Sequence, residues 1–330
     1  MARIADIMLV TVKMVTPART LTAIAIACVI AMPCGAEEAR VQITPRTLSR
    51  TKTAHASAIR VDVKLTLIPV TVTGPLGAPF PGLSKEAFRL IEDGVEQEIK
   101  YFTSEDSPVS LGVVFDASRS MDGKLDQSRQ AVSQFFHTAT PGDEFLAIEF
   151  SSTPKMLCDF TSDTALIEKS LAGIKPKNWT ALFDAVYLAT HQMKRAKNPR
   201  KALLVLSDGN DNYSRYSESE MKSLVREGDV CIYSIGLVGS GLMKRHLRVL
   251  KQLSELTGGH YYEVEKLTDL PAAAEKMSAA IRNQYVLGYF SSKPQSDGLY
   301  RKIEVKLNQE AGLPHLNASW RRGYYAPGEW

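Results

Sequence analysis

Oxygen-bearing side chains stand at three places where the sequence predicts that a strand ends. Asp116, Ser118 and Ser120 share the segment DASRS, Thr180 stands in NWTAL, and Asp208 follows LLVLS. Carboxylates combined with neutral hydroxyls are ligands that suit a hard divalent cation such as Mg²⁺. If the fold brings the three segments together, they predict a metal-centred binding site with a position open for a partner.

Residues 106–286 contain the elements that would position these side chains. Continuous apolar segments, which predict buried strands, alternate with segments whose apolar residues recur at helical spacing. This pattern predicts an α/β fold with a doubly wound, mainly parallel sheet covered by helices on both faces. In such sheets ligands bind beyond the carboxyl ends of the strands, where the strand order reverses. Asp116 and Asp208 each end one of the predicted strands, 111–116 and 201–208.

The segments on either side of this unit alternate between apolar and polar residues, as β-strands do. The first flank covers residues 61–105 and the second covers 287–330, with alternating segments at 285–290, 301–307 and 318–325. Neither flank has enough strands to bury a stable face alone. We therefore expect both to form one small β-sandwich-like domain into which the α/β domain is inserted. Two separate β flanks are the alternative.

The N-terminal segment has the features of a secretory signal peptide. An apolar run at 21–33, too short to span a bilayer, follows basic residues and precedes Cys34, Gly35 and Ala36. We expect a signal peptide at 1–36 and a flexible linker at 37–60. The protein would then be exported to the periplasm, the cell surface or the medium, with no membrane insertion after cleavage. A lipoprotein signal and a translation start at Met14 stay open.

The net charge bears on the kind of partner, and the cysteine content bears on whether disulfides form. The formal net charge of +4 is too small to indicate nucleic acid or an anionic membrane as the main partner. Cys158 and Cys231 are the cysteines that remain after cleavage. Because they fall on strands that should not be neighbours, we expect two free, buried thiols.

The five predicted ligands also carry a resemblance. DASRS after an apolar strand, a threonine about sixty residues later and LSDG after another strand resemble the metal-ion-dependent adhesion site (MIDAS) of von Willebrand factor A (VWFA) domains. The flanking segments VTVTGPLGAPFPGLSKEAFRLIEDGVEQEIKYF and NQYVLGYF resemble bacterial exported proteins described as VWFA-related, which are frequent in Acidobacteria. The resemblance covers most of residues 61–327.

The resemblance implies a metal-dependent binding function without catalysis. It implies that Ser118, Ser120 and often Thr180 bind Mg²⁺ directly, and that Asp116 and Asp208 bind it directly or through water. Mn²⁺ or Ca²⁺ could replace Mg²⁺. The ion would accept a Glu or Asp side chain from a partner protein. Arg119 and Trp179 are candidates for the rim that touches this partner.

Other interpretations of the same residues stay open. Ser118 and Ser120 could cap the helix predicted at 124–138. The protein could be an assembly scaffold in the cell envelope with a stabilising metal. A metal-dependent hydrolase is a third possibility, although no general base is evident beyond the two aspartates.

Overall fold

The computed structural model describes residues 65–326, apart from 76, 105, 178, 239–243, 294–296 and 309–313. These residues belong to one compact unit, Arg60–Trp330. The signal peptide and linker predicted at 1–60 lie outside the described residues. No helix within the described ranges is long and apolar enough to cross a membrane.

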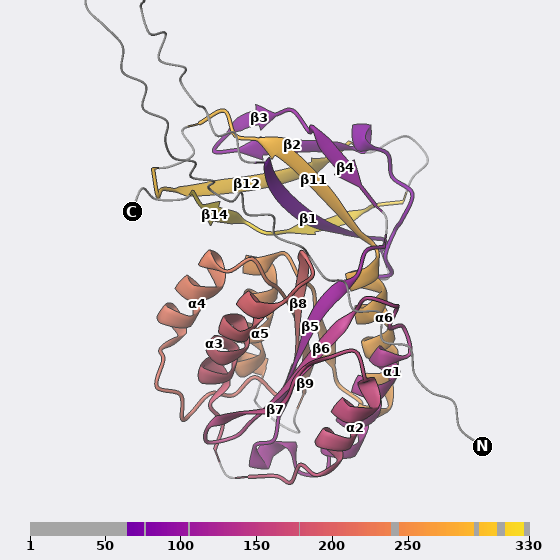
Figure 1. Cartoon of the computed structure of the whole chain (residues 1–330), viewed down its shortest axis with the longest axis vertical. Coiled ribbons are helices and arrows are strands. Elements are labelled where there is room, and N and C mark those ends of the chain that lie inside the picture. The colour runs from indigo at the N-terminus through magenta and orange to yellow at the C-terminus, as the bar shows by residue number, and fades with distance from the viewer. Residues whose placement is uncertain are drawn as a thin grey trace, which may run out of the picture. The chain divides into compact units, whose positions relative to one another are not determined.

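A six-stranded sheet forms the α/β part of the molecule, with strand order β10-β9-β8-β5-β6-β7 (Figure 1). All neighbouring pairs are parallel except β6 and β7, which are antiparallel. The predicted mainly parallel, doubly wound sheet is therefore confirmed. Its strands are β5 (Val109–Asp116), β6 (Glu144–Phe150), β7 (Pro154–Thr161), β8 (Arg200–Ser207), β9 (Cys231–Leu237) and β10 (Tyr261–Val264).

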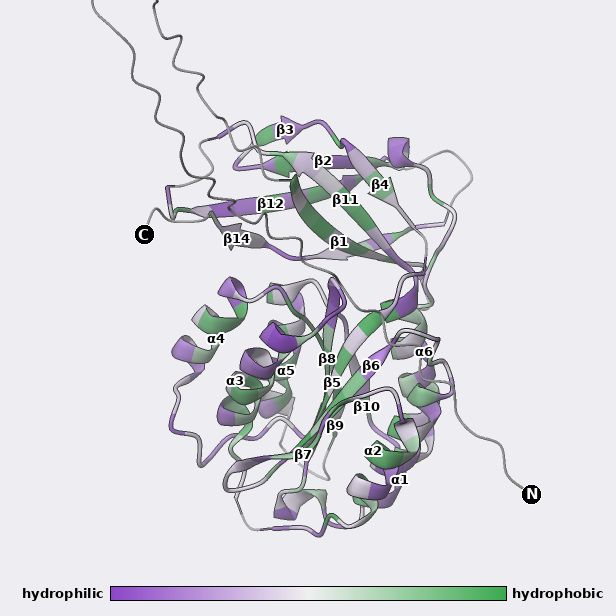
Figure 2. Ribbon diagram, viewed as in Figure 1, coloured by the Kyte–Doolittle hydropathy of each residue, from purple (hydrophilic) through white to green (hydrophobic). Residues whose placement is uncertain are grey.

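Helices cover both faces of this sheet, because its central strands are apolar on both sides. Every residue of β5 is buried. One hydrophobic core joins the sheet to α1 (Leu125–Phe136), α2 (Thr164–Ala172) and α6 (Leu270–Arg282). A second core, on the other face, joins it to α3 (Leu182–Gln192), α4 (Glu218–Glu227) and α5 (Lys244–Thr257). Figure 2 shows the hydrophobic central strands between helices whose surfaces are mixed.

Two antiparallel four-stranded sheets contain the β flanks. Strand β1 pairs with β11, and β2 pairs with β12, so segments from both flanks share each sheet. A common core that includes Val70, Leu90, Tyr285 and Val305 lies between the sheets. One sheet consists of β13 (Asn317–Trp320), β1 (Leu65–Thr73), β11 (Gln284–Phe290) and β4 (Tyr101–Thr103). The other consists of β14 (Gly323–Tyr325), β12 (Tyr300–Leu307), β2 (Phe88–Glu92) and β3 (Val95–Gln97).

The alternating segment 318–325 forms two short strands and not one. Its two halves, β13 and β14, lie in different sheets. Arg321 leaves the first sheet and forms an ion pair with Asp229, 2.8 Å away. Gly323 then lies so close to the Arg301 carbonyl that a Cβ atom would be 2.2 Å from its oxygen. The chain crosses between sheets where a glycine allows this close approach.

Cys158 and Cys231 are free and buried, as the sequence predicts. Cys158 lies on β7 and Cys231 on β9, which are separated in the sheet by β6, β5 and β8. Burial raises the pKa of the Cys231 thiol to about 11, so this group stays protonated and unreactive at neutral pH.

Candidate metal centre

The strand order reverses at β5, which lies between β6 and β8. Phe115 pairs with Leu206 of β8, and Asp116 pairs with Phe150 of β6. Asp116 therefore ends its strand beside Ser207, the residue that precedes Asp208. The two aspartates from distant parts of the sequence meet at the carboxyl edge of the sheet, where doubly wound folds bind ligands.

Asp116 organises the loop that follows β5. Its side chain is fully buried. The backbone N–H of Ser118 donates a 2.8 Å hydrogen bond to Asp116 Oδ1, and the Ser207 hydroxyl donates one of 2.5 Å to Asp116 Oδ2. The loop turns so that the hydroxyls of Ser118 and Ser120 lie 3.0 Å apart. Three of the predicted ligands are thus linked in one hydrogen-bonded group.

The helix-capping interpretation of the two serines is wrong. Ser118 precedes a short 3-10 turn, Arg119–Met121, and its side chain accepts no capping hydrogen bond from the backbone of that turn. Helix α1 begins after Lys124, whose side chain does not cap it. The two serine hydroxyls hydrogen-bond to each other instead, and each oxygen still has at least one lone pair that a cation could use.

Asp208 lies beside this group, and only one of its two carboxylate oxygens has a bonding partner among the described residues. Oδ2 forms a 3.3 Å ion pair with the Lys124 ammonium, and both side chains are largely buried. Among the described residues, the buried Oδ1 has no hydrogen-bond partner. A buried carboxylate oxygen without a partner carries a desolvation cost, which a bound cation would remove.

Thr180 is held between the loops that follow β6 and β8. The backbone N–H of Ala181 donates to the Ser151 carbonyl at 2.7 Å, next to the end of β6. On the other side, Asn212 Oδ1 accepts a 2.9 Å bond from the Thr180 N–H, while the N–H groups of Asn212 and Tyr213 donate to the Thr180 carbonyl. Because β5 lies between β6 and β8, these bonds hold Thr180 at the same edge of the sheet as Asp116.

Burial and the nearby charge of Asp208 disfavour the negatively charged form of the Asp116 carboxyl group. Burial, with a smaller contribution from the negative charge of Asp208, raises the pKa of Asp116 to about 6, although hydrogen bonds from Ser118 and Ser207 oppose the shift. A divalent cation would remove the same repulsion between the two carboxylates. No group of three His, Cys, Asp or Glu side chains suited to a metal occurs among the described residues. The hydroxyls must therefore complete any cation site here, and an all-oxygen set fits Mg²⁺.

The raised pKa predicts how the metal-free protein responds to pH. The folded state binds more protons at Asp116 than the unfolded state between the usual pKa of 3.8 and the folded value of about 6. Stability from this group therefore falls as pH rises through that window, by roughly 3 kcal/mol in total. Chemical denaturation in EDTA should show Asp116→Asn gaining stability relative to wild type between about pH 4 and pH 7. If the difference in unfolding free energy between Asp116→Asn and wild type stays constant across this pH range, the pKa of Asp116 is not raised.

Lys124 is predicted to compete with the metal. Its ammonium neutralises Asp208 and would repel a cation bound nearby. Lys124→Met should raise the affinity for Mg²⁺ by about tenfold, measured by calorimetry, and lower the melting temperature in EDTA. Lys124→Arg, which keeps the charge, is the matched control. Unchanged or weaker Mg²⁺ binding by Lys124→Met would refute competition.

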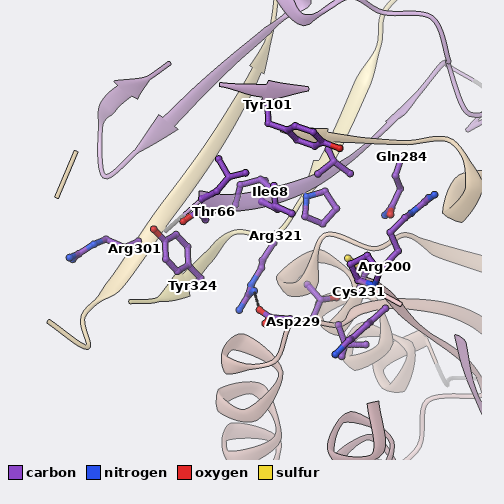
Figure 3. Close-up of a pocket in the computed structure, with 18 of the residues that line it drawn as sticks. Thr66, Ile68, Tyr101, Arg200, Asp229, Cys231, Gln284, Arg301, Arg321 and Tyr324 are labelled. Carbon is purple, nitrogen blue, oxygen red and sulfur yellow. Dashed lines mark hydrogen bonds and ion pairs between the residues drawn. The ribbon is translucent and has the colours of Figure 1, made fainter. Parts of the chain in front are cut away.

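A cavity of about 490 Å³ lies at the opposite end of β8, where its lining includes Arg200, Cys231 and Arg321 (Figure 3). Two of the arginines that line it, Arg321 and Arg200, form bonds to other parts of the protein. Arg321 pairs with Asp229 and donates to the Arg226 carbonyl at 2.6 Å. Arg200 donates to the carbonyls of Ser107 and Ile281. The cavity is at the amino end of β8, roughly 26 Å of strand from Asp208. It is therefore separate from the candidate metal centre.

Comparison with known proteins shows that part of the α/β sheet is similar to a known family. Residues 111–210 match the family described as von Willebrand factor type A domain. The observed sheet topology agrees with this match, so the α/β part has the fold of a von Willebrand factor type A domain. All five predicted ligands, Asp116 to Asp208, fall within the matched residues. A search of curated proteins found no match.

Several solved structures are similar to this chain. A von Willebrand factor type A protein from Catenulispora acidiphila is 11% identical, with a TM-score of 0.47, over 81% of this chain and 74% of that one. An aerotolerance-related membrane protein from Bacteroides fragilis is 18% identical, with a TM-score of 0.45, over 52% and 98%. Proximal thread matrix protein 1 from the mussel byssus, with a zinc-occupied MIDAS motif, is 19% identical, with a TM-score of 0.47, over 58% and 50%.

Sequence reasoning missed three side chains at this edge. Ser207 orients Asp116, Lys124 pairs with Asp208, and Asn212 holds Thr180. Ser207 is adjacent to a predicted ligand and carries a hydroxyl, which was a usable signal. Lys124 and Asn212 reach the site through contacts that link residues 84 and 32 positions apart, and no local pattern predicts such contacts.

Proposed function

We propose that this protein binds a protein partner through Mg²⁺ held by Asp116, Ser118, Ser120, Thr180 and Asp208, with Mn²⁺ and Ca²⁺ as alternatives. The observation that carries the proposal is the buried, unpartnered Oδ1 of Asp208 at the same edge as the serine hydroxyl pair. The ion, when bound, would supply a positive centre that accepts a carboxylate from the partner.

The charges of the donor set support binding of an acidic group. Three of the five proposed ligands are neutral hydroxyls, and the charge of Asp208 is already shared with Lys124. The protein therefore offsets the charge of a divalent cation only partly. The carboxylate of an aspartate or glutamate from a partner would offset the remaining positive charge of the cation.

We propose that the site binds and does not catalyse. Two carboxylates near it, Glu149 and Asp211, are occupied by structural bonds. Glu149 forms a 3.0 Å ion pair with Lys177. Asp211 accepts a 2.9 Å bond from the Phe183 N–H and a 2.6 Å bond from the Ser214 hydroxyl. Neither is free to act as a general base on a metal-bound substrate.

Peptide binding tests the proposal. The purified protein would be applied to an array of short synthetic peptides, each containing one central Asp or Glu and printed beside its Asn or Gln counterpart. We expect acid-containing peptides to bind in Mg²⁺ and to lose binding in EDTA or on replacement by the amide. Equal binding in EDTA would refute metal dependence. A melting temperature that rises with Mg²⁺ while no acidic peptide binds would favour the scaffold interpretation.

We further propose that the protein is exported, as the bacterial VWFA-related proteins that it resembles are. The support is the apolar segment 21–33 with basic residues before it and small residues after it. Expression of the whole chain followed by N-terminal sequencing of the exported form should show cleavage after Ala36. Recovery of uncleaved chain in the cytoplasm would refute this.

A further inference from the structure

Two exposed aromatic side chains stack against each other beside the proposed metal ligand Thr180. The rings of Trp179 and Tyr213 have centroids 5.7 Å apart and planes inclined by 17°. Trp179 is 51% exposed and Tyr213 is 53% exposed. Aromatic rings gain their largest stabilisation when they are buried, so a half-exposed stacked pair retains apolar surface that a partner can cover.

The backbone fixes this pair relative to Thr180. Trp179 directly precedes Thr180 in the sequence. Tyr213 donates its backbone N–H to the Thr180 carbonyl at 3.1 Å, and the neighbouring Asn212 bonds to both backbone groups of Thr180. The aromatic pair and the backbone of Thr180 thus belong to one hydrogen-bonded unit. A partner residue that reaches the metal must place its neighbours near these rings.

The exposed charges around the pair are mostly positive. Among the described residues of 117–124, 174–181 and 209–216, Asp122 is the exposed acidic side chain. The exposed basic side chains there are Arg119, Lys175, Lys177 and Arg215. This balance attracts an acidic segment and disfavours a basic residue next to the acidic one.

We propose that the Trp179–Tyr213 pair binds the side chain adjacent to the acidic residue of a protein partner, and selects an aromatic residue or proline there over a basic one. The inference rests on the proposed function of the metal centre. Trp, Tyr and Arg, which gather at this rim, are the residues that dominate the binding energy of protein–protein interfaces. A rigid aromatic pair provides a large contact area at little cost in conformational entropy.

A position-scanning peptide array tests this selection. Each peptide keeps one central Glu, and the residues beside it vary among Trp, Tyr, Phe, Pro, Ala, Ser, Lys and Arg. In Mg²⁺ the wild-type protein should bind the aromatic and proline peptides at least about tenfold more tightly than the alanine peptides, and the basic ones most weakly. Trp179→Ala and Tyr213→Ala should lose this preference while Mg²⁺ affinity, measured by calorimetry, stays within about twofold.

Tyr101→Ala is the matched control, because Tyr101 is 46% exposed but lies on β4, away from the predicted ligands. It should keep the wild-type preference. Mg²⁺-dependent binding without a neighbour preference, or a preference that survives both aromatic substitutions, would overturn the inference and leave the proposed function intact. Absence of Mg²⁺-dependent binding to any acidic peptide would overturn both. Tighter binding of an oligo-uronate than of every peptide would replace the protein partner with a carbohydrate.

Discussion

Asp116→Asn should abolish Mg²⁺ binding without unfolding the protein. The amide keeps the shape of the carboxylate and can still accept the Ser118 N–H, which now bonds Oδ1 at 2.8 Å. It removes the negative charge that a divalent cation needs. We expect a loss of more than roughly 100-fold in Mg²⁺ affinity by calorimetry, since weaker perturbations around metal ligands already cost tenfold or more.

The same substitution should leave the metal-free protein at least as stable as wild type. Burial disfavours the ionised form of Asp116 and raises its pKa, so a neutral residue avoids that cost. Asp126→Asn is the control, because it also removes a carboxylate, but one with an 83% exposed side chain on α1. The control should bind Mg²⁺ like wild type. Retained binding by Asp116→Asn would show that Asp116 is not a ligand.

Gly209→Ala should lower both the stability of the fold and binding at the proposed metal centre, because Gly209 forms the turn directly after Asp208. Its φ angle is +77°, which favours glycine. An added Cβ would lie 2.7 Å from the His246 carbonyl oxygen and 2.9 Å from its carbon. The backbone at the start of α5 cannot yield as a flexible side chain would. We expect a loss of roughly 3–4 kcal/mol in the free energy of unfolding and weaker Mg²⁺ binding.

Gly123→Ala separates the two causes of this loss. Gly123 has a similar φ of +73° and also lies near the predicted ligands, but nothing within 4 Å would meet its Cβ. Chemical denaturation should give a loss of about 1 kcal/mol, the cost of the left-handed backbone alone. If Gly209→Ala costs no more than Gly123→Ala, the close approach to His246 is unimportant.

The sequence predicts the sheet well, because its strands are continuously apolar and its helices have regular apolar spacing. The segment 111–116 lies within β5, and residues 201–207 lie within β8. Their adjacency followed from the common strand order of such folds, and so did the meeting of Asp116 with the Ser207–Asp208 segment.

The parts that sequence reasoning missed depend on pairings between distant segments. Trp179 was a candidate for the rim, but nothing local indicated that Tyr213 would stack on it. The ion pair of Lys124 with Asp208 likewise joins residues on different elements. In the β flanks, regular alternation over 318–325 concealed the crossing between sheets, because alternation reports exposure and not which sheet a strand joins.

Anomalous diffraction from a crystal soaked in Mn²⁺ tests the central claim most directly. Manganese is a hard cation with oxygen preferences like those of magnesium, and it can be located by its own scattering. We predict one strong peak within bonding distance of the Ser118 and Ser120 hydroxyls, at the edge where Asp116 and Asp208 meet. A soaked crystal with no peak there, or with Lys124 still paired to Asp208 and manganese elsewhere, would contradict it.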